Sequence, residues 1–370
     1  MPDGPPDFSR AAVLAEARSV AADLGARIGV DLDAATLLAG RAAQLGLRRG
    51  GRVSPGGATR LLSARGGWCA ITLSRADDVD AVPALIERDD VAGDDTWSAV
   101  ENWAATRPVD EVVARGRLLG MPTAVLGEAT AAGPVVRRIG AGTSPRPPSG
   151  LLVVDMSSMW AGPLCGQILA WAGATVVKVE SMARPDGTRA GPRSFFDWMN
   201  GGKLSYGADF DDPSGLRALL AVADVVLTSS RPAALEHRGI GPDDLPARDG
   251  RVWLRITGHG ADGAGADFVA FGDDAAVAGG LVGRSADGPV FCADAVADPL
   301  AGLEAAAAAV EALARGGGEL IDVAMSAVAA SYAALPLSPN ESACAALPPT
   351  LPVVRSRAAE LGADNALVDR

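Results

Sequence analysis

The chain has 370 residues, of which 48% are hydrophobic and 21% charged, so it can bury the core of one large domain or of two modest ones. Its formal net charge of -12 argues against nonspecific binding to nucleic acid or to an anionic membrane, because both are polyanions. The longest apolar candidate, Gly302 to Ala314, contains two glutamates and is too short to span a bilayer.

The first residues, Met-Pro-Asp-Gly-Pro-Pro, lack the basic start and apolar core of a signal peptide, so we expect a cytoplasmic protein. The four cysteines are scattered singly, and none lies at metal-ligand spacing from His237 or His259. We therefore expect free thiols and no metal site.

Residues 1–139 predict a small, mainly helical domain. Helices are expected at 10–24, at 33–47 and between 95 and 116, and extended segments at 68–73 and 122–125. Residues 140–150, rich in Pro, Gly and Ser, predict a linker.

After the linker, apolar strands alternate with amphipathic helices, a pattern typical of a mostly parallel, Rossmann-like sheet with helices on both faces. We expect strands at 151–155, 175–180, 224–228, 251–256 and 319–323, with helices at 163–172, at 213–223 and after Asp298. The fold class is therefore α/β, with this domain at 151–335. Residues 336–370 predict a Pro-rich C-terminal arm.

The first turn from strand to helix, Asp155 to Pro163 (DMSSMWAGP), is where an open α/β sheet binds ligands. It lacks G-x-G-x-x-G, which counts against a nicotinamide dehydrogenase. Pro163 at the first helical position leaves free N–H groups that favour an anion, although Gly162-Pro163 could also simply start a helix. Lys178 and Glu180 alternate at the end of the next strand, where they could contact a nucleotide or serve solubility alone.

The segment Phe291 to Gly302 (FCADAVADPLAG) leads into an Ala-rich helix, and Asp298 with Pro299 suits the N-cap and first helical positions. In one interpretation, Asp298 has no role beyond capping its helix, which would stabilise the helix by about 1 kcal/mol. Alternatively, its carboxylate could act as a nucleophile, since a helix N-terminus favours the ionised form. No G-x-S-x-G elbow supports a serine hydrolase using either histidine.

Five motifs in order resemble the class III CoA-transferases, a family that includes formyl-CoA and carnitine-CoA transferases and the α-methylacyl-CoA racemases. They are LLVVDMSSMWAGP (151–163), ILAWAGATVVKVE (168–180), NGGKLSYGADF (200–210), DVVLTSSRPAALEHRGIG (224–241) and ITGHG (256–260). The family's Asp, four residues before a Gly at the start of an Ala-rich helix, is matched by Asp298 and Gly302.

The resemblance implies a CoA-transferase that moves CoA between an acyl-CoA and a carboxylic acid, with Asp298 as the nucleophile. Asp298 would form a mixed anhydride and then an aspartyl-CoA thioester. The resemblance also implies coenzyme A as a substrate rather than a permanently bound cofactor, and a homodimer. The implied CoA contacts are Trp160, Ala161, Gly162, Pro163, Lys178, Glu180, Asn200, Lys203 and Arg231.

Two features depart from the family pattern. Asp273 stands where the racemases carry a proton-shuttling His, and many transferases carry an aromatic there. In addition, Gly67-Trp68 and residues 103–126 resemble segments that typical members place after the nucleotide domain, so the small domain comes first and the interlocked dimer could close differently. The loop at 54–57 (SPGG) could serve as the family's mobile glycine loop.

Three functions remain in view. CoA transfer through Asp298 leads. A racemase or isomerase on the same framework would need two opposed acid/base groups, for which only Asp273 and Asp298 are candidates. A catalytically silent CoA-binding protein is the third, expected if Asp298 is buried and bonded only to its own helix.

Overall fold

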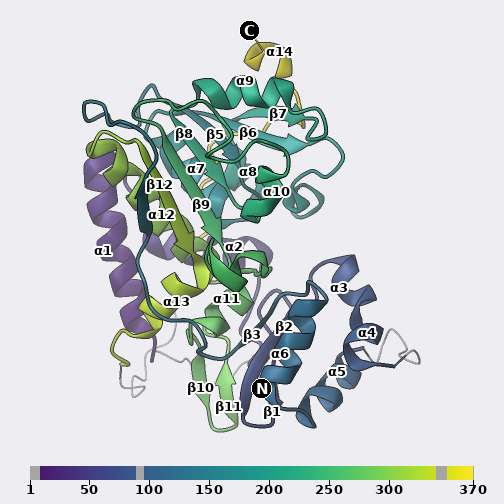
Figure 1. Cartoon of the computed structure of the whole chain (residues 1–370). Coiled ribbons are helices and arrows are strands. Elements are labelled where there is room, and N and C mark those ends of the chain that lie inside the picture. The colour runs from purple at the N-terminus through teal and green to yellow at the C-terminus, as the bar shows by residue number, and fades with distance from the viewer. Residues whose placement is uncertain (1–8, 89–95, 339–347, 370) are drawn as a thin grey trace.

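The computed structural model describes residues 9–88, 96–338 and 348–369 (Figure 1). Its largest element is a seven-stranded sheet in the order β4-β12-β9-β8-β5-β6-β7, parallel throughout except where β4 pairs antiparallel with β12. The strands are β4 (Val135–Arg138), β5 (Leu152–Met156), β6 (Thr175–Ser181), β7 (Leu204–Ala208), β8 (Val225–Thr228), β9 (Val252–Thr257) and β12 (Glu319–Ala324). The predicted α/β class with a mostly parallel sheet is confirmed.

Alternate residues of these strands enter two different cores, as the two-residue period of a strand requires. Val153 and Leu254 join the core beneath α7 (Ala161–Trp171) and α12 (Ala297–Ala314). The neighbouring Val154 and Trp253 join the core beneath the helices of the opposite face. Those helices are α9 (Ser214–Val222) and α10 (Pro232–Glu236), and α8 (Arg193–Asn200) lies between β6 and β7 in the chain.

The first two helices pack on the large sheet's own core. Buried residues of α1 (Ala11–Ile28) and α2 (Ala34–Leu45) belong to the same cluster as α7 and α12, and Figure 1 shows α1 alongside α12. Arg10 fastens this segment by donating to the carbonyls of Gly280, Val282 and Ala333. Residues 1–139 therefore contribute to the large core as well as forming a smaller unit.

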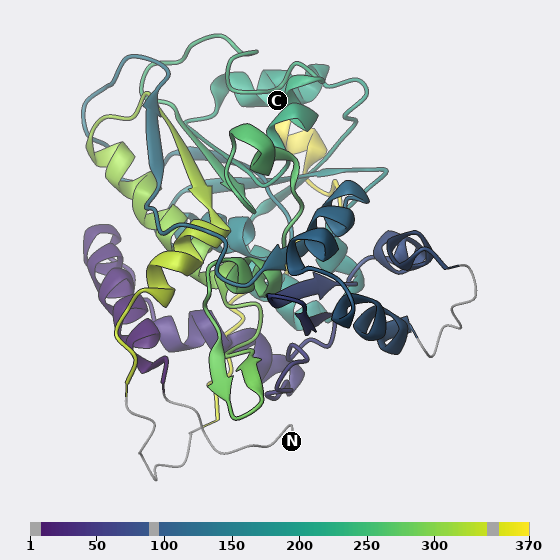
Figure 2. The same cartoon turned by 60° about the horizontal axis from the view of Figure 1, so that its bottom comes forward.

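That smaller unit has a core of its own, built on a three-stranded antiparallel sheet that the sequence did not fully indicate. Its elements are β1 (Thr59–Ala64), β2 (Gly67–Thr72), β3 (Thr123–Val125), α3 (Ala76–Asp80), α4 (Val82–Ile86), α5 (Thr96–Ala105) and α6 (Val109–Leu118). Leu61 and Ala70 of this sheet pack on Val277 of α11 (Gly272–Ala278). Figure 2 shows α11 beside the smaller unit and the hairpin β10 (Gly283–Ser285)–β11 (Gly288–Val290) below it. Helix α11 thus lies at the boundary between the two cores.

The described part of the C-terminal arm runs beside the edge strand β7. Asp364 accepts the Ser205 N–H, and the Asn365 side chain bonds both the N–H and the C=O of Gly207. The short helix α14 (Asn365–Val368) follows. Helix α13 (Met325–Ala333), after β12, completes the large unit. Within the described ranges, none of the helices combines the length and apolarity needed to cross a membrane.

Candidate active site

The topological switch point of the large sheet lies between β5 and β8. From β5 the chain first builds β6 and β7 on one side, and then returns to add β8, β9 and β12 on the other. Ligands of open α/β sheets bind in the crevice outside the carboxyl ends of strands at such a point. Here the Ser158 N–H donates to Ser229 Oγ at 3.0 Å, joining the loops that follow β5 and β8. Helix α7 begins at Ala161, shortly after Ser158, so its N-terminus lies close to this junction.

The turn after β5 is held by a buried ion pair. Met159 has a left-handed φ of 72°, and its N–H donates to both carboxylate oxygens of Asp186 at 3.2 Å. Lys178 Nζ lies 2.9 Å from Asp186 and also bonds the Ser157 carbonyl. Although burial alone would raise it, Lys178 and Thr188 lower the pKa of Asp186 to about 2. Lys178 therefore supports the turn from beneath, with 2% of its surface exposed.

A second buried group supports the start of α7. Lys203 Nζ lies 2.8 Å from Asp155 Oδ2, 2.8 Å from the Pro163 carbonyl and 3.1 Å from Asn200 Oδ1. All of its polar contacts are internal, and both members of the Lys203–Asp155 pair have fully buried side chains. Glu180 is likewise buried, and Arg189 binds its two carboxylate oxygens. The sequence placed these charges at a nucleotide, whereas here they are neutralised inside the fold.

The remaining expected CoA contacts divide by exposure. Trp160, Ala161, Gly162 and Pro163 are all buried, and a Cβ on Gly162 would overlap the Ser157 side chain. Arg231, which precedes α10 after β8, is exposed. Among the nine expected CoA contacts, Arg231 is thus the one whose charge faces solvent.

Asp298 is not the N-cap of its helix, which corrects the expected position. Helix α12 begins at Ala297, so Asp298 is its second residue. Its carboxylate Oδ2 instead accepts the N–H of Gly272 at the start of α11, at 3.2 Å. Ala295, with a left-handed φ of 42°, makes the preceding turn and accepts the Asp298 N–H through its carbonyl. The reading in which Asp298 only caps its own helix is therefore wrong.

Burial and neighbouring charge act together on Asp298. Burial, together with the Asp273 carboxylate, raises the pKa of Asp298 to about 7, against the opposing effects of Arg41 and the Gly272 N–H. Asp273 itself accepts the Ala295 N–H at 2.9 Å, so it fixes the turn that presents Asp298. Burial also raises the pKa of Asp273, to about 6.

Arg41 links this carboxylate cluster to the turn at the switch point. Its Nη1 lies 2.6 and 2.7 Å from the two oxygens of buried Asp294, four residues before Asp298. Its guanidinium stands 5.7 Å from the ring centroids of both Trp160 and Phe195. Arg41 and Asp294 were absent from the expected site, because nothing in the local pattern of α2 distinguishes a partly buried arginine from an exposed one.

The glycine-rich loop at 54–57 lies beside the carboxylates of Asp273 and Asp294. Ser54 Oγ accepts the N–H of Thr59 at 3.2 Å, and the Thr59 side chain in turn contacts the Asp273 carboxylate at 3.2 Å. A Cβ on Gly56 would stand 3.8 Å from Asp294 Oδ1. The loop therefore lies close to Asp294, and it bonds Thr59, which contacts Asp273. The acidic side chains of the described ranges do not meet in an arrangement suited to a metal ion.

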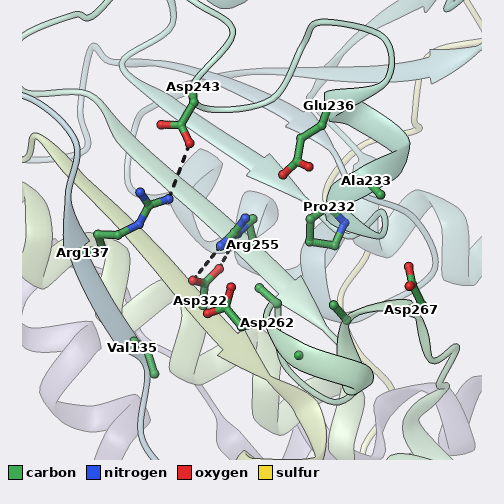
Figure 3. A pocket seen from close by; sticks show the side chains of 13 residues that line it. Val135, Arg137, Pro232, Ala233, Glu236, Asp243, Arg255, Asp262, Asp267 and Asp322 are labelled. Atoms are coloured by element: carbon green, nitrogen blue, oxygen red, sulfur yellow. Dashed lines mark hydrogen bonds and ion pairs between the residues drawn. The ribbon is translucent and has the colours of Figure 1, made fainter.

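A separate cleft of 520 Å³ lies on the opposite face of the sheet from α12 (Figure 3). Arg255 and Asp322 form an ion pair across its floor, and Glu236, Asp262 and Asp267 surround it. Most of its charged side chains are acidic, so it does not suit the phosphates of CoA. This cleft is therefore separate from the site around Asp298.

The chain is similar in sequence to curated CoA-transferases and to a related racemase. The chain is 32% identical over 199 residues to succinyl-CoA–D-citramalate CoA-transferase of Chloroflexus aurantiacus, covering 48% of this chain and 49% of the relative. It is also 32% identical over 160 residues to human alpha-methylacyl-CoA racemase, covering 40% and 39%. The chain thus spans about half the length of the curated relatives it matches.

Among solved structures, a crystal structure of a hypothetical protein (Rv3272) from Mycobacterium tuberculosis aligns with a TM-score of 0.46 at 30% identity, covering 51% of this chain and 56% of the other. The model of CoA-transferase family III matches residues 149–342, which include the switch-point turn and Asp298. The chain belongs to CoA-transferase family III.

Proposed function

We propose that this protein is a CoA-transferase that moves CoA between an acyl-CoA thioester and a carboxylic acid, with Asp298 as the covalent nucleophile. The observation that carries the proposal is the placement of the Asp298 carboxylate, which is held by the N–H of Gly272 on another helix and not by its own. A carboxylate with a raised pKa is also a stronger nucleophile than an ordinary one once it is ionised.

In the proposed reaction, a carboxylate oxygen of Asp298 attacks the thioester carbonyl carbon, the C–S bond breaks, and the CoA thiolate leaves. The product is a mixed anhydride of Asp298 and the donor acid. The thiolate then attacks the aspartyl carbonyl of the anhydride, which releases the donor acid and forms an aspartyl-CoA thioester. The same steps then run in reverse with the acceptor. Its carboxylate attacks the aspartyl-CoA thioester and releases the thiolate, and the thiolate attacks the acceptor's carbonyl in the new anhydride, which forms the new acyl-CoA and frees Asp298. The covalent intermediates on Asp298 divide one difficult acyl exchange into easier steps.

Coenzyme A is expected to enter at the switch point, with its anionic part near the N-terminus of α7 and the exposed Arg231. The buried pairs of Lys178 and Lys203 are proposed to hold the shape of this turn rather than to contact the phosphates directly. A homodimer and a cytoplasmic location remain predictions of the sequence.

The test is intact-protein mass spectrometry after incubation with a panel of acyl-CoAs, with hydroxylamine trapping and peptide mapping. We expect an adduct on Asp298 in the wild type and in Asp287→Asn, an exposed control in the β10–β11 turn, and none in Asp298→Asn. Because only the ionised carboxylate attacks, the rate of adduct formation should rise with pH through about 7.

Racemisation is the second candidate, favoured by the second carboxylate, Asp273, beside Asp298. Solvent deuterium entering the substrate's α-carbon, with no adduct, would select it over CoA transfer. Measurable CoA binding with neither adduct nor exchange would instead indicate a silent binding protein.

A further inference from the structure

Two buried carboxyl groups at the start of α11 are joined by two threonine hydroxyls from the smaller unit. Thr59 and Thr72 are directly opposite each other in the β1–β2 pair, and their Oγ1 atoms lie 2.9 Å apart. Thr59 Oγ1 lies 3.2 Å from Asp273 Oδ2, and Thr72 Oγ1 lies 3.0 Å from Asp274 Oδ1. The four side chains form one continuous row of oxygen atoms.

Counting hydrogens shows that this row needs an additional proton. Each of the three oxygen–oxygen contacts requires one hydrogen, but the two hydroxyls supply only two. The Ser54 hydroxyl, which accepts the Thr59 N–H, is not a member of these three contacts and so supplies none of their hydrogens. If both carboxyls were ionised, one contact would bring two buried oxygens together with no hydrogen between them, which is unfavourable.

The surroundings indicate where the proton rests. Asp273 accepts hydrogen bonds from the Ala295 N–H and from Thr59, and these favour its ionised form. Asp274 is 0% exposed, its Oδ1 accepts the Phe271 N–H, and its Oδ2 has no hydrogen-bond partner among the residues that the structure describes. An unpartnered, fully buried oxygen suits the carbonyl of a neutral acid much better than a carboxylate.

We propose that Asp273 and Asp274 share a single proton through the hydroxyls of Thr72 and Thr59, and that this relay sets the charge facing Asp298. In the resting arrangement, Asp274 donates to Thr72, Thr72 to Thr59, and Thr59 to ionised Asp273. A shift of three protons, from Asp274 to Thr72, from Thr72 to Thr59 and from Thr59 to Asp273, protonates Asp273 without water, leaves Asp274 ionised and reverses the direction of both hydroxyls. Asp273 and Asp274 are therefore positioning residues for Asp298 and do not themselves attack the substrate.

Other charged groups around the relay are few. Asp294 and Asp298 face Asp273, and Arg41 forms an ion pair with Asp294. Arg75, which precedes α3, interacts electrostatically with Asp274. The segments β2, β3 and α13, which pack on α11, carry no charged side chain. Burial raises the pKa of Asp274 to about 8 and that of Asp273 to about 6, so the relay should hold one proton near pH 7.

The proton count is measurable by infrared spectroscopy of the C=O stretch of protonated carboxylic acids, in full-length Asp298→Asn so that Asp298 does not contribute. Subtracting the spectrum of the variant that also carries Asp273→Asn and Asp274→Asn isolates the relay. We expect the band at pH 7 to have half the amplitude that it reaches in acid, where both carboxyls are protonated. A full-amplitude band, or none, at pH 7 overturns the proposal.

If the triple variant does not fold, the same count comes from the pH dependence of Asp298→Asn alone, where one proton should leave between pH 7 and pH 9. Thr72→Val removes the hydrogen-bond partner of the acid and should shift the band. Thr123→Val, an equally buried threonine of the same small sheet, should leave it in place. A band unmoved by Thr72→Val would show that the proton is not on the relay.

The effect on Asp298 rests on the proposed function, whereas the proton count does not. Asp273→Asn keeps an acceptor for the Ala295 N–H but removes the charge, so the pH midpoint of adduct formation should fall below that of the wild type. Asp273→Ala loses the acceptor as well, and should lower the rate at high pH. An unchanged midpoint in Asp273→Asn would refute the influence on Asp298. Absence of any adduct in the wild type would refute the proposed function alone.

Discussion

Buried charges in this protein either neutralise one another or hold protons, and the difference follows from their partners. Lys203 and Asp155 meet at 2.8 Å with both side chains fully buried, so the ion pair replaces the lost hydration. Within the described part of the chain no cation forms an ion pair with Asp274, and burial raises its pKa to about 8. The first arrangement stabilises the turn at the switch point, while the second places a titratable group beside Asp298.

Replacing Lys203 by Met should leave Asp155 buried and unpaired, and should lower the free energy of unfolding by about 3–5 kcal/mol. Arg27→Met, which removes an exposed pair with Asp23 on α1, is the control and should change it by no more than about 0.5 kcal/mol. Urea unfolding followed by tryptophan fluorescence measures both. Equal effects of the two variants would show that the Lys203 pair is not the support of the turn.

At the scale of elements, the sequence predicted well wherever a period was clear. Strands β5, β6, β8, β9 and β12 and helices α7 and α12 begin and end within a few residues of expectation, because apolar runs and cap residues mark them locally. Strand β4 (VVRR) is short and exposed on an edge, so no pattern indicated it. The pattern of an amphipathic helix indicates that one face is buried, but it does not indicate which element covers that face. The packing of α1 and α2 on the large core was therefore missed.

The same reasoning separates the predictable part of the site from the rest. Asp298 could be found because its signal lies within twelve consecutive residues, from Phe291 to Gly302. The relay could not, since Thr59 is separated from Asp273 by 214 positions and Thr72 from Asp274 by 202. Only the pairing of β1 with β2 and the docking of both on α11 bring these side chains together.

Gly302 lets α12 approach α7 closely, one turn after Asp298. A Cβ at this position would lie 2.6 Å from the Ala161 carbonyl oxygen, so Gly302→Ala should push the helices apart and destabilise the protein by about 1–3 kcal/mol. Gly133→Ala, in the loop before β4 where an added Cβ would meet no described atom within 4 Å, is the control without a close contact. An ordinary helical Gly→Ala change is stabilising, so a gain in thermal stability for Gly302→Ala would contradict this contact.

For the whole molecule, the two cores meet at the candidate active site. The smaller unit supplies Thr59 and Thr72, the N-terminal segment supplies Arg41 and the loop at 54–57, and the large unit supplies Asp298. Ionisation near Asp298 is therefore linked to the stability of the contact between the units. This linkage gives the molecule a characteristic dependence on pH.

Asp273, Asp298 and Asp274 have folded-state pKa values raised to about 6, 7 and 8, against about 3.9 in an unfolded chain. Between these limits the folded state binds more protons than the unfolded state, so stability must fall as pH rises from about 4 to about 8. Asp186 acts oppositely, because its pKa is lowered to about 2 and its contribution is lost as pH falls from about 4 to about 2. Melting temperatures should therefore drop from pH 5 to pH 9, and less so in Asp274→Asn; a rise over this range would show that the cluster at Asp298 ionises freely in the folded protein.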